Sequence, residues 1–485
     1  MPTLRYYQLL TITNNFFYQP EATITTGTQS RLRSVCSLLL VPHELVKFIP
    51  NSSLLTPHFY MTHFGIICPA TTGHLNPMLT LGYELQRRGH RVTLFGVVDV
   101  QTKTLQAGLE FRAIGESEFP KGAIAQHLAY LGKLSGLAAS GYTIKILKQT
   151  AAVTLRDVPK TIKQVGVEAL LVDQVSFEGG TIAEFLDIPF ITICSALVLH
   201  QEDSIPPHFT NWRYTSALWA RLRNSTVYRL LSLAQIMGDV ILEYRREWKL
   251  PKLTRYNDGY SQLAQISQQP AEFEFPRQHL PPWFHFTGPL HSSIGRETDT
   301  FPYEQLTGQP LIYASMGTTQ NRLLKIFSSI AEACNGLDAQ LVISLGGSLT
   351  VESLPRLPGS PLVVGYAPQL ELLKKTTLTI THAGLNTTLE SLTNGVPMVA
   401  IPIANDQPGV AARIAWTGTG EFIPVSRLSV PKMRAAIHRV LTQASYKQNA
   451  LRLQEAIRRT GGVSRAADVV EQAISTGKPV LSSAD

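Results

Sequence analysis

From Met61 onward, the sequence alternates short apolar runs with longer segments of helical periodicity. The first run, HFGIIC at residues 63–68, is almost wholly apolar, which is typical of a strand buried on both faces. The runs RVTLFGV at 91–97, EALLVD at 168–173 and FITIC at 190–194 repeat the pattern, with helical segments between them. Strands that alternate with helices in this way predict a parallel sheet covered by helices.

A polar stretch rich in turn residues, 291–310, interrupts this pattern, which then begins again. The later apolar runs are LIYASMG, AQLVISLGG, LVVGY, LTITHAG and PMVAIPI. The less regular segment 200–290 holds a long helical stretch from about Trp212 to Trp248, and we expect it to complete the first domain. The predicted fold class is α/β, with two facing Rossmann-like, doubly wound parallel-sheet domains and a cleft between them at the carboxyl ends of the strands.

A chain of 485 residues predicts two or three domains. The first part, up to residue 60, shows no sustained period, so we expect either a poorly ordered arm or an extension wrongly assigned upstream of a natural start at Met61. The expected divisions are this extension at 1–60, a first domain at 61–293, a linker at 294–309, a second domain at 310–460, and a C-terminal helix and tail at 461–485.

Composition excludes several classes of function. The net charge is +8, but the basic residues are scattered and there is no zinc-knuckle spacing or basic arm, so we expect no nucleic-acid partner. The four cysteines are far apart and predict buried, reduced thiols in a cytoplasmic protein. No apolar run reaches the length of about 18 residues that a transmembrane helix needs.

The richest stretch of candidate binding residues begins at Gly365. Its sequence THAGLNTT marks a point where a strand passes into a helix, and it contains His382, Gly384, Asn386 and Thr387. Such a junction offers free backbone N–H groups and the positive end of a helix dipole, which would bind a diphosphate. Glu390 follows one turn later and could reach a ribose hydroxyl. Asp406 and Gln407 end the next strand and could bind sugar hydroxyls.

Four short motifs recur in a fixed order over this stretch: aromatic-x-P-Q, H-x-G-x-N-[ST]-T-x-E, G-V-P-M and D-Q-P. They resemble the donor-binding signature of the UDP-dependent glycosyltransferases, of the plant secondary-product type and its bacterial relatives. The resemblance extends over the chain from Met61. It implies the GT-B fold, with the acceptor bound in residues 61–293 and the nucleotide sugar in residues 310–460.

The resemblance also implies a role for each residue of the donor site. It assigns the uracil to Tyr366 and Gln369, the diphosphate to His382, Asn386, Thr387 and Thr318, the ribose to Glu390, and the sugar to Asp406 and Gln407. Tyr366 and Leu385 depart from the plant signature, which has tryptophan at both positions, whereas Gln407 resembles the glucose-preferring version.

Neither a metal ion nor a cofactor beyond the UDP-sugar co-substrate is expected. No two aspartates are separated by a single residue, so the sequence lacks the DxD motif of metal-dependent glycosyltransferases. A helix N-terminus, His382 and nearby hydroxyl groups would instead stabilise the UDP leaving group. No GxGxxG follows the first strand, which disfavours a dinucleotide cofactor.

His74 is the candidate catalytic base. It lies in TTGHLNP next to Gly73, in an expected loop before a helix that begins near Asn76 and Pro77. Its family counterpart takes the proton of the acceptor hydroxyl, a task for which histidine is suited near neutral pH. Asp173, at the end of a strand, resembles the carboxylate that orients this base. The alternatives are a structural histidine and an aspartate that only caps the next turn.

The sequence therefore predicts an inverting glycosyltransferase that moves a hexose, with glucose favoured, from a UDP-sugar to a hydroxyl of a hydrophobic acceptor. Bacterial relatives with the GHLNP opening and the SMGT loop resemble enzymes that act on carotenoids such as zeaxanthin, on sterols or on macrolides. Two alternatives stay open: a UDP-sugar epimerase-like enzyme of the same fold, and a non-catalytic UDP-sugar-binding partner.

One further segment, 212–229, combines four arginines with aromatic residues and has no acidic residue. A basic aromatic helix of this kind can lie on an anionic membrane surface, which predicts a peripheral membrane contact. The favoured alternative is an ordinary exposed helix that covers the acceptor pocket.

Overall fold

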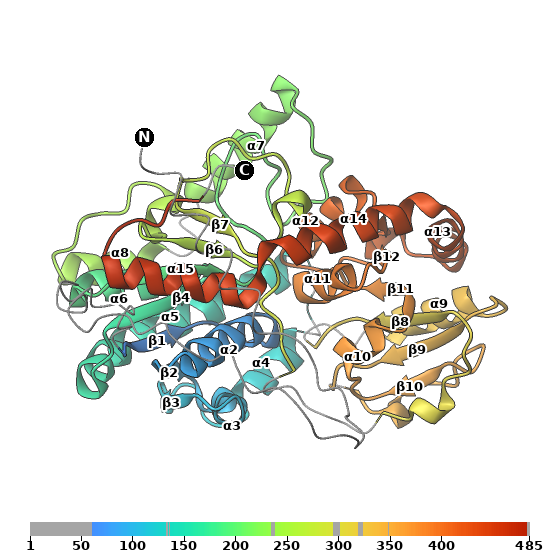
Figure 1. Ribbon diagram of the computed structural model, residues 1–485, viewed down its shortest axis with the longest axis horizontal. Coiled ribbons are helices and arrows are strands. Elements are labelled where there is room, and N and C mark those ends of the chain that lie inside the picture. The colour runs from blue at the N-terminus through green and yellow to red at the C-terminus, as the bar shows by residue number, and fades with distance from the viewer. Residues whose placement is uncertain are drawn as a thin grey trace, which may run out of the picture. The chain divides into compact units, whose positions relative to one another are not determined.

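The computed structural model in Figure 1 describes residues 61–131, 134, 136–233, 238–293, 301–318, 324–347 and 349–482. The expected N-terminal extension, residues 1–60, lies outside the described residues. Part of the expected linker, 294–300, lies outside them as well.

A seven-stranded parallel sheet forms the N-terminal lobe, in the order β3-β2-β1-β4-β5-β6-β7. Its strands are β1 (His63–Ile67), β2 (Arg91–Gly96), β3 (Glu110–Ala113), β4 (Ala169–Asp173), β5 (Phe190–Cys194), β6 (Gln265–Ser267) and β7 (Phe284–Phe286). The strands expected from the apolar runs are β1, β2, β4 and β5, whereas β3, β6 and β7 are too short or too polar to stand out in the sequence.

A six-stranded parallel sheet forms the C-terminal lobe, in the order β10-β9-β8-β11-β12-β13. Its strands are β8 (Leu311–Ser315), β9 (Gln340–Ser344), β10 (Leu362–Val364), β11 (Thr376–Thr381), β12 (Met398–Ala400) and β13 (Gly420–Phe422). Two facing parallel sheets therefore confirm the predicted fold class.

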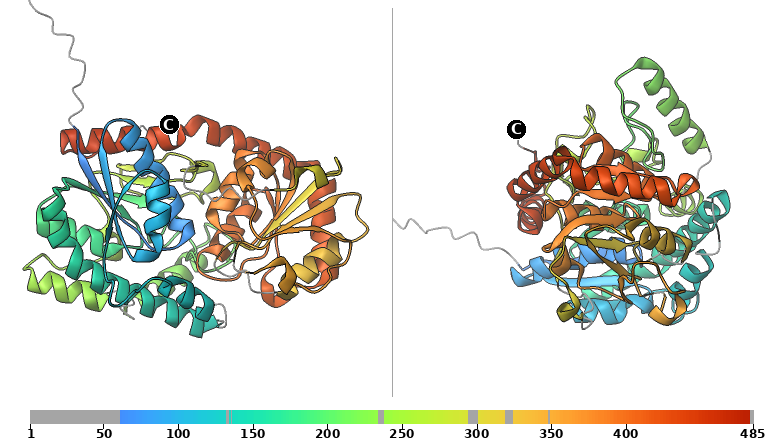
Figure 2. Two further views of the ribbon diagram at one scale, coloured as in Figure 1. Left: turned by 90° about the horizontal axis from the view of Figure 1, so that it is seen from below. Right: turned by 90° about the vertical axis from the view of Figure 1, so that its right-hand side faces the viewer.

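Helices cover both faces of each sheet (Figures 1 and 2). In the N-terminal lobe they are α2 (Thr72–Arg87), α3 (Gln101–Gln106), α4 (Ala123–Leu131), α5 (Gly136–Val165), α6 (Phe177–Leu186), α7 (Leu218–Leu233) and α8 (Gly238–Glu247). In the C-terminal lobe they are α9 (Leu324–Cys334), α10 (Gln369–Leu373), α11 (Leu385–Thr393), α12 (Gln407–Trp416), α13 (Val430–Thr442) and α14 (Ala444–Thr460).

The central strands are apolar throughout because their two faces enter two different cores. On β1, Phe64 and Ile66 join a core with α2, whereas Ile67 joins a second core with α5 and α6. On β4, Leu171 belongs to the first core and Leu170 to the second. This double burial is the physical basis of the continuous apolar runs.

The last helix, α15 (Gly462–Thr476), returns from the C-terminal lobe to pack on the N-terminal lobe. Figure 1 and the left view of Figure 2 show α14 and α15 running one after the other along the two lobes. Arg88 at the end of α2 binds Asp468 and Glu471 of α15, each at 2.7 Å. The end of the chain thus ties the two lobes together.

Two expectations about helices are wrong. The chain from Trp212 to Trp248 is not one helix, because residues 211–217 are not helical and α7 begins only at Leu218. Tyr214 in that segment stacks on Phe275, with ring centroids 5.3 Å apart, so tertiary packing overrides the helical pattern there. The helix expected near Asn76 begins earlier, at Thr72.

Candidate active site

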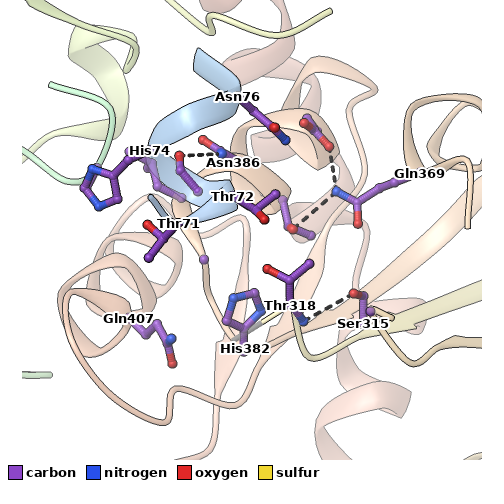
Figure 3. Close-up of a pocket in the computed structure, with 18 of the residues that line it drawn as sticks. Thr71, Thr72, His74, Asn76, Ser315, Thr318, Gln369, His382, Asn386 and Gln407 are labelled. Carbon is purple, nitrogen blue, oxygen red and sulfur yellow. Dashed lines mark hydrogen bonds between the residues drawn. The ribbon is translucent and has the colours of Figure 1, made fainter. Parts of the chain in front are cut away.

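A pocket of about 220 Å³ lies between the carboxyl ends of the two sheets. Every site residue expected from the sequence lines it except Asp173: Gly73, His74, Thr318, Tyr366, Gln369, His382, Gly384, Asn386, Thr387, Glu390, Asp406 and Gln407. Figure 3 shows Thr72, His74 and Asn76, from the start of α2, on one side of this pocket. The pocket therefore brings together segments that are more than 300 positions apart in the chain, since an Asn386–Gly73 hydrogen bond spans 313 positions.

His74 lies in the first turn of α2 and not in a loop. The helix begins at Thr72 because Thr71 has an extended backbone and its carbonyl accepts the N–H groups of both His74 and Leu75. This turn holds the imidazole at the edge of the pocket, with 21% of the side chain exposed. A helical start fixes the backbone of His74 more firmly than a loop would.

Asp173 lies behind His74, fully buried at the end of β4. Its Oδ2 is 2.9 Å from Nδ1 of His74, and its Oδ1 accepts the N–H of Val175 at 3.0 Å. Asp173 therefore has both of the roles expected from the sequence: it is the hydrogen-bond partner of His74, and it caps the turn after its strand. Because a carboxylate only accepts, Nδ1 carries the proton and Nε2 keeps a lone pair.

The charge of Asp173 controls the basicity of His74. Burial alone lowers the pKa of His74, but the attraction and hydrogen bond of Asp173, with a smaller contribution from Asp406, outweigh it and raise the pKa above its ordinary value. A histidine with a raised pKa holds an accepted proton more firmly.

The junction between β11 and α11 forms the opposite wall. His382 follows β11, Ala383 has a left-handed backbone with φ of 63°, and Gly384 is the N-cap of α11. The His382 ring packs so tightly that a Cβ at Gly384 would lie 2.5 Å from it, and one at Gly317 would lie 2.6 Å from it. Burial lowers the pKa of His382 to about 4, so this ring is neutral near pH 7.

Two residues expected to bind the nucleoside contact each other. Nε2 of Gln369 donates to Oε2 of Glu390 at 2.6 Å and to Oγ1 of Thr387 at 3.3 Å. The hydroxyl of Tyr313 donates to Oε1 of Gln369 at 3.0 Å. Tyr313, on β8, is a lining residue that the sequence did not reveal, because it lies inside an ordinary apolar run.

Asp406 is the N-cap of α12, and Gln407 is the first residue of this helix. Asp406 is half-buried, desolvation raises the pKa of its carboxyl group, and its Oδ2 accepts the N–H of Leu197 in the other lobe at 3.1 Å. Gln407 accepts the N–H groups of Ile403 and Ala404 through Oε1, at 2.9 and 3.0 Å. These bonds hold the start of α12 with both side chains at the pocket.

Asn386 crosses between the lobes. Its Nδ2 donates to the Gly73 carbonyl at 2.9 Å, and its Oδ1 accepts Nε2 of Gln268 at 2.8 Å. The same Gln268 nitrogen also contacts the Ser195 carbonyl. Gln268 is almost wholly buried, and no sequence motif points to it.

Proline explains why the Gly73 carbonyl is available. In α2 this carbonyl would normally accept the N–H of the residue four positions later, which is Pro77. Proline has no backbone N–H, so the carbonyl lacks its partner within the helix. Asn386 supplies the missing donor from the opposite lobe.

Within the described residues, no group of three or more His, Cys, Asp or Glu side chains is placed to hold a metal ion. In the same part of the chain, no helix has both the length and the apolarity needed to cross a membrane.

Comparison with known proteins identifies the family. The family described as "UDP-glucoronosyl and UDP-glucosyl transferase" matches residues 249–459. A zeaxanthin glucosyltransferase of Pantoea ananas is 33% identical over 87% of this chain and 98% of its own length. The chain belongs to this UDP-glycosyltransferase family. A second zeaxanthin glucosyltransferase, of Pseudescherichia vulneris, is 31% identical over 87% of this chain and 100% of its own length.

Solved structures agree on the fold of this UDP-glycosyltransferase. The calicheamicin glycosyltransferase CalG4 matches with a TM-score of 0.66 and 22% identity, over 87% of this chain and 100% of its own. The glycosyltransferase of kitacinnamycin matches with a TM-score of 0.65 and 22% identity, over 85% of this chain and 99% of its own. The protein is a glycosyltransferase enzyme with the GT-B fold.

Proposed function

We propose that this enzyme transfers glucose from UDP-glucose to a hydroxyl group of a carotenoid-like acceptor, with inversion at the anomeric carbon. The observation that carries the proposal is the 2.9 Å contact between His74 and the buried Asp173, at the edge of a pocket lined by the donor signature. The two zeaxanthin glucosyltransferases, at 33% and 31% identity to this chain, favour a hydroxylated carotenoid over a sterol or macrolide as the acceptor.

His74 acts as the general base in the proposed reaction. Nε2 takes the proton of the acceptor hydroxyl while the acceptor oxygen forms a bond to the anomeric carbon of the sugar. The bond between that carbon and the β-phosphate oxygen breaks on the opposite face, and UDP leaves with the electron pair. The charge of Asp173 stabilises the imidazolium that forms, which is consistent with the raised pKa of His74.

The donor roles follow the motif. The N-terminus of α11, with Asn386 and Thr387, binds the diphosphate and stabilises the charge that develops on UDP. His382 is neutral near pH 7 and contributes a hydrogen bond and no full charge. The remaining donor residues act as the motif implies: Thr318 at phosphate, Tyr366 and Gln369 at uracil, Glu390 at ribose, and Asp406 and Gln407 at the sugar. This arrangement requires no metal ion.

The hydrophobic character of the proposed acceptor indicates where the enzyme meets it. Carotenoids and sterols partition into lipid, so we propose that the enzyme contacts a membrane peripherally. Its cytoplasmic location stays a prediction.

The test supplies UDP-glucose and a panel of hydroxylated carotenoids, sterols, macrolides and flavonoids to the purified full chain. UDP release is measured and products are weighed by mass spectrometry. A carotenoid product heavier by one hexose supports the proposal. Release of UDP with an altered sugar and no glycoside would instead identify the epimerase-like alternative.

Replacement of the base gives the matching control. His74→Ala is expected to lower the rate of transfer by about a hundred- to ten-thousand-fold and to leave UDP affinity near normal. His438→Ala, on the exposed side of α13, should change neither. A normal rate in His74→Ala would remove His74 as the base.

A further inference from the structure

The outward face of α7 exposes large apolar side chains to solvent. Leu218, Trp219, Leu222 and Leu230 have between 60% and 81% of their surface exposed. At the helical period, these four positions cover roughly a third of the circumference of the helix. Isolated exposed leucines are ordinary, but a stripe of this kind on one helix face marks an interaction surface.

The opposite face holds α7 firmly in place. Ala220 is buried, Nδ2 of Asn224 donates to the Asp203 carbonyl at 3.0 Å, and the Tyr228 hydroxyl donates to the Ile205 carbonyl at 3.2 Å. The helix is therefore anchored, and its apolar stripe is the face left over after packing. Figure 1 and the right view of Figure 2 show α7 standing out from the rest of the lobe.

The charged side chains of α7 and of the segment just before it are all positive. Arg213, Arg221, Arg223 and Arg229 lie in or just before α7, and the chain has no acidic residue from 204 to 238. Arg221 and Arg229 are exposed. Arg223 lies over the ring of Trp212 at 3.8 Å and near that of Trp219 at 5.3 Å, so a cation borders the apolar stripe directly.

The apolar stripe and the arginines beside it favour one kind of binding partner over another. A second copy would bring the same arginines face to face and would be repelled. An anionic lipid surface offers phosphates for the arginines and an apolar layer, just beneath, for leucine and tryptophan. We propose that α7 docks this enzyme on an anionic membrane, with Leu218, Trp219, Leu222 and Leu230 entering the headgroup boundary.

The segment before the docking helix also contacts the C-terminal lobe. Tyr214, just before α7, packs against Trp416 at the end of α12, with ring centroids 6.3 Å apart. The first residue of α12 is Gln407, which lines the pocket. A membrane-bound α7 would therefore hold the cleft close to the lipid, where a hydrophobic acceptor is dissolved. The docking proposal itself does not depend on which acceptor is used.

The experiment is flotation of the full chain with vesicles. Vesicles of phosphatidylcholine mixed with phosphatidylglycerol are expected to carry the protein, and vesicles of phosphatidylcholine alone to carry much less. Binding should weaken as salt is raised, because exposed charges are screened. Each of R221Q and R229Q is expected to lower the apparent affinity for the anionic vesicles about fivefold. The triple variant L218S/W219S/L222S should abolish flotation.

Matched controls separate docking from folding and from activity. Leu105→Ser and Arg458→Gln alter exposed residues on α3 and α14 and should float normally. Glucosyl transfer to a water-soluble hydroxylated acceptor should be unchanged in the α7 variants. If the parent and every variant transfer glucose to no acceptor of the panel, the proposed function is refuted, whereas flotation still tests the docking proposal.

Two outcomes would overturn the docking proposal. One is absence of flotation of the parent chain with anionic vesicles. The other is a self-associated species in sedimentation that the triple variant abolishes, which would assign the α7 face to a second copy of the chain.

Discussion

The side chain of Asn386 donates a hydrogen bond across the cleft to the Gly73 carbonyl, 2.9 Å away, where Pro77 has removed the normal helical donor. Gly73 immediately precedes His74, so the donor lobe contacts the residue next to the proposed base. Gln268 fixes the orientation of the Asn386 amide, because its Nε2 donates to Oδ1. The proposed diphosphate site and the proposed base are thus linked by one amide side chain.

Gln268→Glu tests this link. The change replaces a buried donor by an acceptor that faces the oxygens of Ser195 and Asn386. We expect the free energy of unfolding to fall by about 1–3 kcal/mol and UDP affinity to weaken, because the Asn386 amide loses its fixed orientation. Chemical denaturation and titration calorimetry with UDP measure the two effects. Gln448→Glu, on the exposed side of α14, is the control. Unchanged UDP affinity would show that Gln268 has no part in the donor site.

Gly384→Ala tests the packing around His382. Gly384 has a negative φ of −66°, so its backbone accepts alanine without strain, but the new Cβ would lie 2.5 Å from the His382 ring. We expect overpacking to lower the free energy of unfolding by about 1–3 kcal/mol. Displacement of the α11 N-terminus should lower the transfer rate on the order of tenfold to a hundredfold.

Gly141→Ala is the control for that change. Its Cβ would meet nothing within 4 Å, so no loss of stability or rate is expected. If Gly384→Ala behaves in the same way as Gly141→Ala, the His382 ring has room to move and the tight packing is not required.

The fold could be predicted from the sequence because strands that are buried on both faces appear as continuous apolar runs. Segments that are only partly buried leave no such run. The short strand β7 reads as FHF, and Tyr214 lies in a segment of helical composition that packs in an extended form. Helix α2 begins at Thr72 because the Thr71 carbonyl captures two N–H groups, which composition alone does not reveal.

The lining residues of the site were predictable where a motif gathers them within a short stretch. Asp173 belongs to no such stretch and was identified by its strand-end position and by its resemblance to the family's orienting carboxylate; it lies behind His74 and outside the pocket lining. Gln268 and Tyr313 carry no local signal, because their roles arise from the approach of distant segments. Pro77 shows in the sequence that the Gly73 carbonyl lacks its helical donor, but the sequence does not show that Asn386 supplies another donor.

Glu274→Gln tests a buried ion pair between the lobes. Nε of Arg413 on α12 lies 3.0 Å from Oε1 of Glu274, both side chains are 2% exposed or less, and the guanidinium also lies over the Phe275 ring at 4.1 Å. Removal of the carboxylate charge leaves the guanidinium buried and uncompensated, so the free energy of unfolding should fall by about 3–5 kcal/mol. Denaturation by urea measures the change.

Glu371→Gln provides the exposed counterpart, since Glu371 pairs with Lys374 in solvent at 2.8 Å. Its effect should stay within about 0.5 kcal/mol. Similar losses in Glu274→Gln and Glu371→Gln would mean that another group compensates the charge of Arg413. Arg277 cannot do so, because it is also positive and lies 3.5 Å from the same Glu274 carboxylate.

Asp173→Asn tests the electrostatic control of the base through pH. A base must be neutral to accept a proton, so the rate of the parent enzyme should fall as the pH drops through the pKa of His74, which Asp173 raises above the ordinary value of about 6.5. Asparagine removes the attraction but leaves the burial, which lowers the pKa. The acid limb of the kcat/KM profile should therefore move to lower pH, while the plateau falls by about a hundred- to ten-thousand-fold because the imidazolium is no longer stabilised.

Asp338→Asn, which changes an exposed residue, should move neither the acid limb nor the plateau of this profile. A lower plateau with an unmoved acid limb would mean that Asp173 only positions the ring and does not set its charge.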